Sequence, residues 1–281
     1  MSLQKVEVYS SSQLTSTLLV DDSGPIEADY VQVLNIDGLD PVTATIDVVT
    51  SGNVDGAVAM DAAVPTRNIV LTIRPNPDWV TWTAEQLRQF IYNYFVPKSL
   101  VRLYFTSDEI SGEVWIEGVV ESCGANPFAK DPTYLVSIVC ADPYFMASDP
   151  VVVDGAIINP ANWPTSKSTI SNPGNVPIGM ILTVADGYDN ELYIQAQNPA
   201  VGTFHLIGSV AGILYMGSIP TKKYLRSGDL ANGTFTNRLY ELQPGSVWPV
   251  LAPGDNDFAV MNAYNIGVTW ELSFYPKYAG L

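Results

Sequence analysis

Histidine, cysteine and positive charge are all scarce in this sequence of 281 residues. A Ser-His-Asp or Cys-His catalytic arrangement would require the one histidine, His205, which lies in the apolar run Phe204-His205-Leu206 and is interpreted as structural. This histidine and two separated cysteines, Cys123 and Cys140, do not supply a usual structural zinc site. Neither of the common glycine-rich phosphate-binding motifs is present. We therefore expect no enzyme activity, no cofactor, no catalytic residue and no metal ligand.

The low cysteine count also argues against a secreted disulfide scaffold. We expect two reduced thiols, although a local bridge stays open if paired strands bring Cys123 and Cys140 together. Residues 1–9 lack the apolar core of a signal peptide, and no apolar stretch approaches the roughly 18 residues of a membrane span. The sequence thus predicts neither secretion nor a membrane anchor.

Charge is sparse and unevenly distributed. Only 15% of the residues are charged, against about 25% in a typical globular domain. A surface with so little charge is typical of assembly interfaces, whose centres are depleted of charged residues. Residues 1–150 hold 7 Lys/Arg and 20 Asp/Glu, a net charge of −13, whereas residues 151–281 carry −3. Affinity for nucleic acid comes mainly from Lys and Arg, so this acidity argues against tight DNA or RNA binding. It suits a surface that DNA passes without sticking, or serves solubility alone.

The sequence has the strand-and-turn punctuation of a mainly β protein. Turn dipeptides such as Asp37-Gly38, Asp154-Gly155 and Asn232-Gly233 separate short runs rich in Val, Ile, Thr and Tyr. The strands expected from these runs are Tyr30–Ile36, Val42–Thr50, Leu100–Thr106, Tyr134–Cys140, Met180–Val184, Glu191–Ala196, Gly212–Met216, Asp257–Met261 and Ile266–Tyr275.

One α-helix is predicted over Thr83–Phe95, because its apolar residues recur at helical spacing. Thr83 is the expected N-cap, and Gln86 stands three residues later, as a capping box requires. Trp82 precedes the cap, where it can form a hydrophobic staple with Leu87. Pro97 ends the helix.

Two domains are expected from the chain length, with a boundary at 145–165, where prolines cluster and the charge balance changes. We assign 1–150 to an N-terminal β-rich domain that contains the helix and 151–281 to a C-terminal β-sandwich.

Carboxylates are numerous enough to raise the question of a paired-acid glycoside hydrolase or a calcium site. Because they lie in Gly-, Asn- and Pro-rich segments, we interpret them as solvated turn residues. The clusters are Asp21, Asp22, Glu27 and Asp29; Asp186, Asp189 and Glu191; and Asp255 and Asp257.

A series of segments in the first half carries a family resemblance. They are, in order, Arg67–Ile73, the predicted helix, Leu100–Phe105, Trp115–Ser122, Asn126–Phe128 and Val136–Phe145. Their order resembles the N-terminal domain of distal tail proteins (the Dit family) of long-tailed, siphovirus-type bacteriophages. The second half, through Leu251–Asn256 and Val268–Leu272, is similar in layout to the galectin-like β-sandwich of that family. No sugar-binding residues of true galectins can be matched.

The resemblance implies a structural virion protein at the phage tail tip, assembled in the host cytoplasm. Members of the family form a homo-hexameric ring around the DNA channel. One face binds the tail tube, and the other binds the tail hub or tail-associated protein. Tape measure, receptor-binding and other baseplate proteins are further partners to consider. No membrane is involved, and DNA is expected to pass without specific binding.

The alternative hypothesis is a carbohydrate-binding adsorption module that recognises the host cell surface. It rests on the second-half sandwich and on three aromatic candidates, Trp163, Tyr188 and Trp248, whose rings could stack on sugars or belong to the core.

For the ring hypothesis, we expect the segments 1–9 and 30–36 to supply strands whose open edges pair between subunits. The interface residues predicted with them are Val6, Val8, Val31, Val33, Trp115, Phe128, Tyr144 and Phe145.

Overall fold

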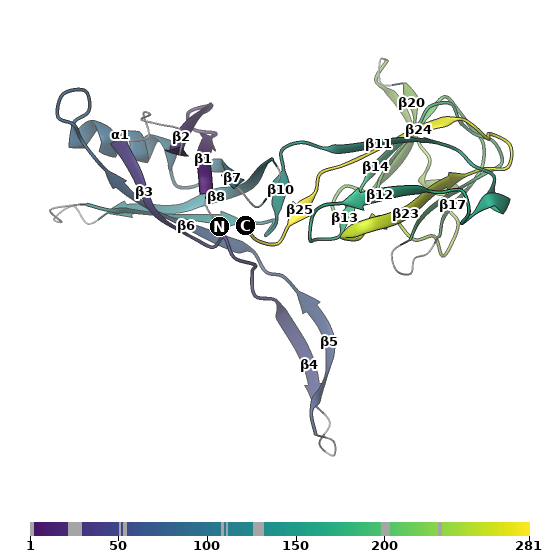
Figure 1. Ribbon diagram of the computed structural model, residues 1–281, viewed down its shortest axis with the longest axis horizontal. Coiled ribbons are helices and arrows are strands. Elements are labelled where there is room, and N and C mark those ends of the chain that lie inside the picture. Colours follow the sequence, from purple (N-terminus) through teal and green to yellow (C-terminus); the bar gives the residue numbers. More distant parts are fainter. Residues whose placement is uncertain are drawn as a thin grey trace. The chain divides into compact units, whose positions relative to one another are not determined.

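The computed structural model describes the chain except for residues 1–2, 22–29, 51, 53–54, 108–109, 111, 126–131, 198–202 and 230–231. The described chain is mainly β, with one α-helix, as predicted (Figure 1). It divides into two compact units, Asp149–Lys277 and Met1–Ser148 together with Tyr278–Leu281. The first unit is therefore discontinuous, which the expected boundary at residue 150 did not include. No helix among the described residues is long and apolar enough to cross a membrane.

The first unit is built on an antiparallel sheet with the strand order β2-β1-β7-β8-β9-β6-β3. A short strand, β10, pairs with β8 beside this path. The chain re-enters the unit at β25 (Lys277–Tyr278). The strands of the sheet are β1 (Leu3–Ser10), β2 (Thr15–Asp21), β3 (Val31–Asp37), β6 (Arg67–Pro75), β7 (Leu100–Ser107), β8 (Glu113–Ala125), β9 (Tyr134–Cys140) and β10 (Phe145–Ala147).

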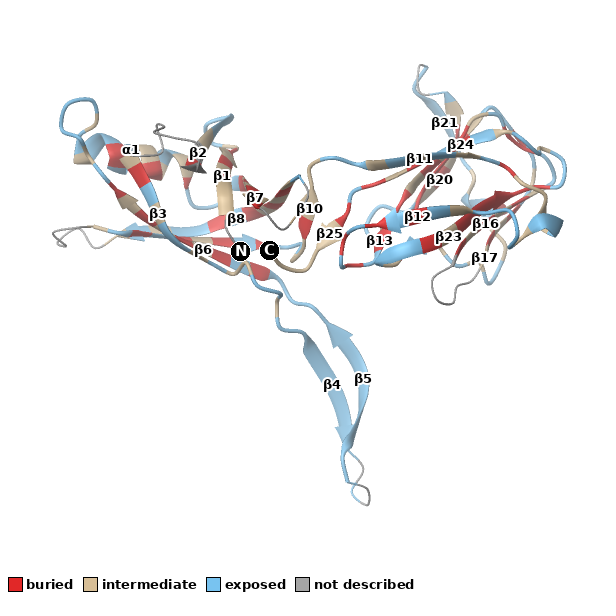
Figure 2. Cartoon of the chain, in the orientation of Figure 1, coloured by how far each residue is buried: buried red, intermediate tan, exposed pale blue. Residues whose placement is uncertain are grey.

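One face of this sheet forms the core of the first unit. Side chains alternate along β6, with Ile69, Leu71 and Ile73 fully buried, as strand periodicity requires. The helix α1 (Ala84–Tyr94) adds Leu87 and Ile91 to the same cluster. Figure 2 shows this alternation of buried and exposed residues along the strands.

The helix confirms the prediction from its capping signals. The hydroxyl of Thr83 accepts a hydrogen bond from the Gln86 backbone N–H, and the Gln86 side chain accepts one from the Thr83 N–H. Trp82 packs edge-on against Phe90 and also contacts Tyr30, which fixes the entry into the helix.

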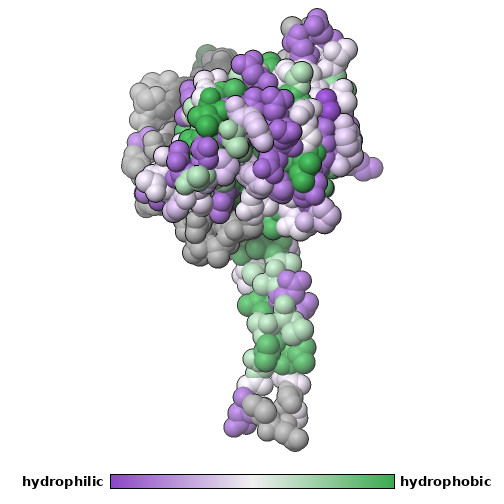
Figure 3. Space-filling view, turned by 90° about the vertical axis from the view of Figure 1, so that its right-hand side faces the viewer, coloured by the Kyte–Doolittle hydropathy of each residue, from purple (hydrophilic) through white to green (hydrophobic). Residues whose placement is uncertain are grey.

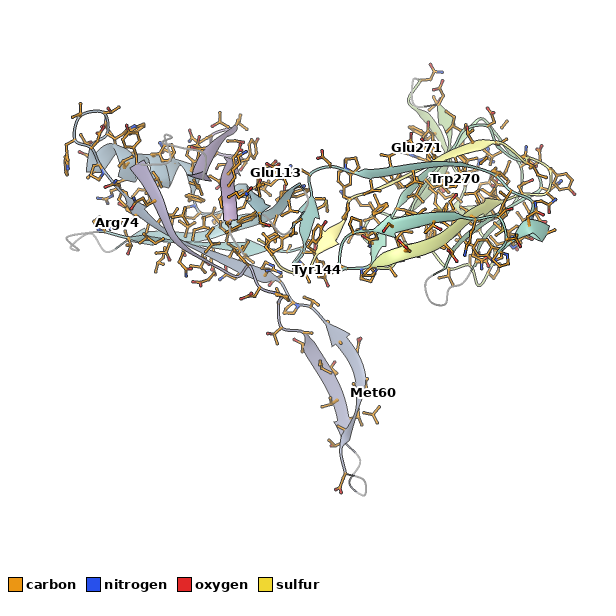
Figure 4. All side chains as sticks on the ribbon, viewed as in Figure 1. Met60, Arg74, Glu113, Tyr144, Trp270 and Glu271 are labelled. Atoms are coloured by element: carbon orange, nitrogen blue, oxygen red, sulfur yellow. The ribbon has the colours of Figure 1, made fainter. Side chains whose placement is uncertain are left out.

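The second unit is a β-sandwich. One sheet has the order β11-β24-β14-β19-β20-β21 and the other β12-β23-β16-β17, and their inner side chains form one hydrophobic core. Figure 4 shows that side chains alternate between the inside and the outside of the sandwich along β24 (Thr269–Phe274), where Trp270 points inward and Glu271 outward. The strands of the sandwich are β11 (Val151–Ala156), β12 (Ser168–Asn172), β14 (Ile181–Val184), β16 (Glu191–Gln197), β17 (Thr203–Ile207), β19 (Ile213–Gly217), β20 (Tyr224–Asp229), β21 (Thr234–Asn237), β23 (Gly254–Met261) and β24 (Thr269–Phe274). Shorter elements are β13 (Ile178–Gly179), β15 (Gly187–Tyr188), β18 (Val210–Ala211), β22 (Val250–Leu251) and the 3-10 turns η2 (Pro160–Asn162) and η3 (Leu239–Glu241).

The cysteines are free thiols, and the local bridge that the sequence left open is not formed. Cys140 is buried in the core of the first unit, and Cys123 is half-buried. Burial raises the pKa of both thiols to about 11, so they stay protonated at neutral pH.

Candidate assembly surfaces

A large exposed apolar surface of the first unit is a two-stranded hairpin, which we call the arm. It consists of β4 (Thr45–Thr50) and β5 (Ala57–Ala63), and every described residue of both strands is exposed (Figures 1 and 2). Its large apolar side chains are between 57% and 68% exposed: Ile46, Val48, Val49, Val58 and Met60. Figure 3 shows apolar colour over much of this hairpin, and Figure 4 shows Met60 directed away from it. A single hairpin in water is marginally stable at best, so this arm lacks the packing partner that would stabilise it.

The root of the arm is fastened by a buried arginine, Arg67, four residues beyond β5. The guanidinium donates hydrogen bonds to the backbone carbonyl oxygens of Pro143 (2.6 Å), Asp40 (2.8 Å), Gly38 and Ala279. It also lies over the ring of Phe145, 4.6 Å from its centroid. Burial lowers the pKa of Arg67, and the nearby Cys140 and Asp40 oppose that effect.

These hydrogen bonds join the two sides of the arm root to the C-terminal residues of the first unit. A further bond runs from the Leu281 N–H to the Leu39 carbonyl oxygen (3.0 Å). Gly38 adopts a φ of 91°, and a Cβ there would overlap the carbonyl oxygen of Asn68. The arm therefore leaves the sheet from a root that is held by specific contacts.

The predicted interface residues fall into three groups. Four are core residues of their own chain: Val6, Val8, Val31 and Phe145. Three are half-buried: Val33, Trp115 and Tyr144. Phe128 lies outside the described residues. An interface made by these strands would use their backbone edges and outward side chains, since the four core residues already have packing partners.

The edges of the sheet differ from the expectation for the N-terminal strand. β1 pairs with β2 on one side and with β7 on the other, so it offers no open edge. β3 is an edge strand, because it pairs with β6 alone in the described sheet. The expectation of an open edge is therefore wrong for β1, the described part of segment 1–9, because β2 pairs along it. For the segment 30–36 the expectation is consistent with the edge position of β3.

The outer face of the same sheet carries an apolar row that the sequence analysis did not identify. Leu100, Val119 and Val139 are neighbours across β7, β8 and β9 and are all exposed. On the same strands, the guanidinium of Arg102 lies over the ring of Trp115, 4.2 Å from its centroid. It also forms an ion pair with the Glu117 carboxylate at 2.7 Å. The sequence pattern could have identified this row, because these apolar residues stand at the outward positions of strands with alternating side chains.

The loop before α1 presents an exposed aromatic residue on an ordered backbone. Trp79 is 71% exposed and Val80 is 93% exposed, and Trp79 has a φ of 63°, which is unusual for a residue other than glycine. The carboxylate of Asp78 accepts hydrogen bonds from the backbone N–H groups of Trp82 (2.8 Å), Thr81 (2.9 Å) and Val80 (3.0 Å). The bond from Trp82 contributes most to lowering the pKa of Asp78. A preorganised apolar loop of this kind suits docking to a partner.

The carboxylates are only partly the turn residues that were expected. Glu191 lies within β16, and Asp255 and Asp257 lie within β23, because polar residues at alternate positions of a strand face outward. Asp257 forms an ion pair with Lys167 (2.5 Å). No group of three or more His, Cys, Asp or Glu side chains in the described part of the chain could hold a metal ion.

The three aromatic sugar-binding candidates separate in the structure. Tyr188 is a core residue whose hydroxyl donates a hydrogen bond to the buried Glu241 (2.6 Å), and burial followed by this bond raises its pKa. Trp248 packs on Phe204, 4.8 Å between ring centroids. Only Trp163 of the three lines an open pocket. For Tyr188 and Trp248 the structure thus favours packing, which is one of the two alternatives that the sequence left open.

Comparison with known proteins finds similarity in structure alone. No protein-family profile and no curated protein matches the sequence. The Dit protein (gp 19.1) of phage SPP1, a paradigm of the hub adsorption apparatus in phages that infect Gram-positive bacteria, matches with a TM-score of 0.65 and 13% identity, covering 97% of this chain and 98% of that one. Two structures of the phage P2 baseplate in its activated conformation, with Ca and with Sr, match with a TM-score of 0.46 over the whole of both chains, at 10% and 9% identity. Over nearly its whole length, the chain therefore has the fold of a phage distal tail (Dit) protein, as the order of segments between Arg67 and Phe145 predicted.

Proposed function

We propose that this protein is a structural component of a phage tail tip. In this proposal, six copies form a ring that joins the tail tube to the tail hub or baseplate and surrounds the DNA channel. The first unit builds the ring, and the second unit is the galectin-like sandwich that carries adsorption or baseplate proteins. The observation that carries the proposal is the correspondence to the SPP1 Dit fold over both units.

The arm supports self-association in particular. Its apolar side chains extend from a root that is fixed by Arg67, and its own chain leaves them exposed. Burying a Val or Met side chain fully is worth about 1.5–3 kcal/mol, so five such residues on a neighbouring copy would contribute substantially to a contact. A second copy is the favoured occupant, because the edge strand β3 and the outer apolar row of the same unit offer further surface for it.

The charge of the first half supports a channel role. Residues 1–150 carry a net charge of −13, and a ring multiplies this charge around its axis. Like charge repels the phosphate backbone and limits sticking during DNA passage. The protein should therefore form no complex with DNA, so a change in the salt concentration should release none.

The experiment that tests the proposal is molar mass by light scattering over a wide concentration range, with negative-stain images of the same fractions. The protein is measured alone and mixed with the tail-tube and hub proteins of the same phage. A species of six chains with a central hole is expected. A monomer under every one of these conditions would refute the ring.

Two variants sharpen this test. The double substitution Val48→Asp and Met60→Asp places charges on the arm, which should abolish the six-chain species because a buried unpaired charge is strongly unfavourable. Val152→Asp is the matched control, since it changes an exposed valine of the second unit. If the arm variant forms rings as readily as the control, the arm is not the contact.

A further inference from the structure

The outer face of the four-stranded sheet of the second unit contains an open pocket of about 550 Å³. The register of two strands produces its floor, since Tyr193 of β16 lies opposite His205 of β17, and Gln195 lies opposite Thr203. The residues between them, such as Ile194 and Phe204, point into the core. Alternation along two paired strands thus gathers polar and aromatic side chains on one surface.

Two segments outside these strands form the rim. The loop Gln243–Ser246 is fixed over β17 by hydrogen bonds to the backbone of His205. The Gln243 N–H donates to the His205 carbonyl oxygen (3.0 Å), and the Ser246 hydroxyl accepts from the His205 N–H and donates to its carbonyl oxygen. On the other side, Trp163 follows η2 and is half-exposed. The chain before η2 is tied to the end of β23 by the bond from the Asn262 N–H to the Ile158 carbonyl oxygen (3.0 Å).

The polar groups on the floor form a partly satisfied network. Tyr193 donates its hydroxyl hydrogen to Glu191 Oε2 (2.7 Å), and this bond is the main reason that the pKa of Tyr193 is raised. His205 stacks on Tyr193, with 4.2 Å between ring centroids and 15° between planes. His205 Nε2 lies 3.4 Å from the same Glu191 oxygen, yet it is inaccessible to water and makes no hydrogen bond with any described residue. Buried polar atoms without a partner are uncommon, and His205 Nε2 is one of them in the described part of this floor.

The composition of the pocket restricts the ligand class. The described residues of the lining include no Lys or Arg and therefore offer no cationic group for a phosphate or another strong anion. The floor is too polar for a purely apolar ligand, whose binding would remove water from the Glu191 carboxylate and from the side-chain amides of Gln195 and Gln243. Aromatic faces beside amide, hydroxyl and carboxylate groups match a sugar ring, which has apolar C–H faces and a rim of hydroxyl donors and acceptors.

We propose that this pocket binds a neutral saccharide, with Trp163 packed against a C–H face of the sugar and Glu191, Gln195 and Gln243 hydrogen-bonded to its hydroxyls. The site binds without hydrolysis, because Glu191 is the one carboxylate among the described lining residues and glycoside hydrolysis usually requires a pair. The proposal is independent of the ring, since it concerns the second unit alone.

The test uses the full-length protein and an array of neutral mono- and oligosaccharides, followed by calorimetric titration of the sugars that bind. A second arm measures sedimentation of the protein with insoluble bacterial cell-wall glycan. Binding in either arm supports the pocket, and the arm that responds identifies a free sugar or a surface polymer as the source. No binding in both arms, at sugar concentrations up to roughly 10 mM, overturns the proposal.

Variants then locate the binding. Trp163→Ala and Gln195→Ala should each weaken the measured affinity about fivefold or more, because the first removes the stacking contact and the second a hydrogen bond to the sugar. Tyr264→Ala is the matched control, since Tyr264 is an exposed aromatic residue of the same unit outside the lining, and its affinity should equal that of the wild type. Circular dichroism of each variant verifies folding. Equal affinity in Trp163→Ala, or binding restricted to anionic polymers, would overturn the assignment.

Discussion

Replacing Arg67 by Met should destabilise the first unit more than any surface substitution. The guanidinium is 2% exposed and bonds four backbone carbonyl oxygens, from Gly38, Asp40, Pro143 and Ala279. Methionine has a comparable length but no donor, so all four acceptors would lose their partner.

The expected loss in the free energy of unfolding follows from the four carbonyl acceptors that Arg67→Met leaves without a donor. An unsatisfied buried polar group costs about 1–3 kcal/mol, so four carbonyls at the low end of this range give a loss of about 4 kcal/mol. That is a large part of the total stability of a typical domain, about 5–15 kcal/mol. Arg67→Lys should lose less, because an ammonium keeps three donors but lacks the planar fork that reaches several carbonyls.

The assay is urea denaturation of the wild type, Arg67→Met, Arg67→Lys and the control Arg88→Met, which changes an exposed arginine of α1. Amide hydrogen exchange at Leu281 provides a local readout, because its N–H bonds the Leu39 carbonyl oxygen at the arm root (3.0 Å). A loss below about 1 kcal/mol for Arg67→Met, or unchanged exchange at Leu281, would refute the role of Arg67 as the clamp of the arm root.

Three other expected outcomes follow from the same unit. Gly38→Ala should lower the free energy of unfolding by about 2 kcal/mol or more in urea denaturation, since its φ is 91° and a Cβ would overlap the Asn68 carbonyl; an unchanged value would contradict this backbone argument. Thr83→Ala should cost about 1 kcal/mol through loss of the N-cap, and Thr83→Ser should retain most of that stability. Cys123 and Cys140 should react slowly with a thiol reagent at pH 8 and rapidly in denaturant, because burial raises their pKa to about 11. Since the unfolded thiols ionise at lower pH than the folded ones, stability should fall as pH rises from about 9 toward 11, and a flat profile there would count against the burial of both thiols.

Local signals in the sequence were sufficient for the helix and for the nine strands that were expected, each of which overlaps an observed strand. The boundary of α1 depends on contacts within four residues, between Thr83 and Gln86, and such contacts are readable from one segment. The strand β9 coincides with the predicted Tyr134–Cys140, because alternation there reflects one buried face. Glu191 was expected both as the first residue of the strand Glu191–Ala196 and as a turn carboxylate. It lies within β16, so the strand prediction holds and the turn interpretation does not.

The features that concern assembly were less accessible from the sequence. Residues 57–63 were not predicted as a strand, and the strand expected over 42–50 was assigned without any statement of its exposure, whereas both strands of the arm are exposed. Periodicity reports that a face is apolar, not which chain covers it. The pocket around His205 was likewise missed, because it depends on the register of β16 against β17 and on a loop about 40 residues further along. His205 was interpreted as a satisfied structural residue, but its Nε2 has no hydrogen-bond partner among the described residues.

The discontinuity of the first unit has a consequence for the order of events during synthesis. Residues 278–281, which include the Ala279 carbonyl held by Arg67, leave the ribosome only after the entire second unit has been translated. A nascent chain that has completed residues 1–148 therefore still lacks part of the arm root, while its core strands are already present. Translation thereby delays a fully anchored arm until both units exist, and in the proposed ring this order would keep unfinished chains on the same messenger RNA from associating.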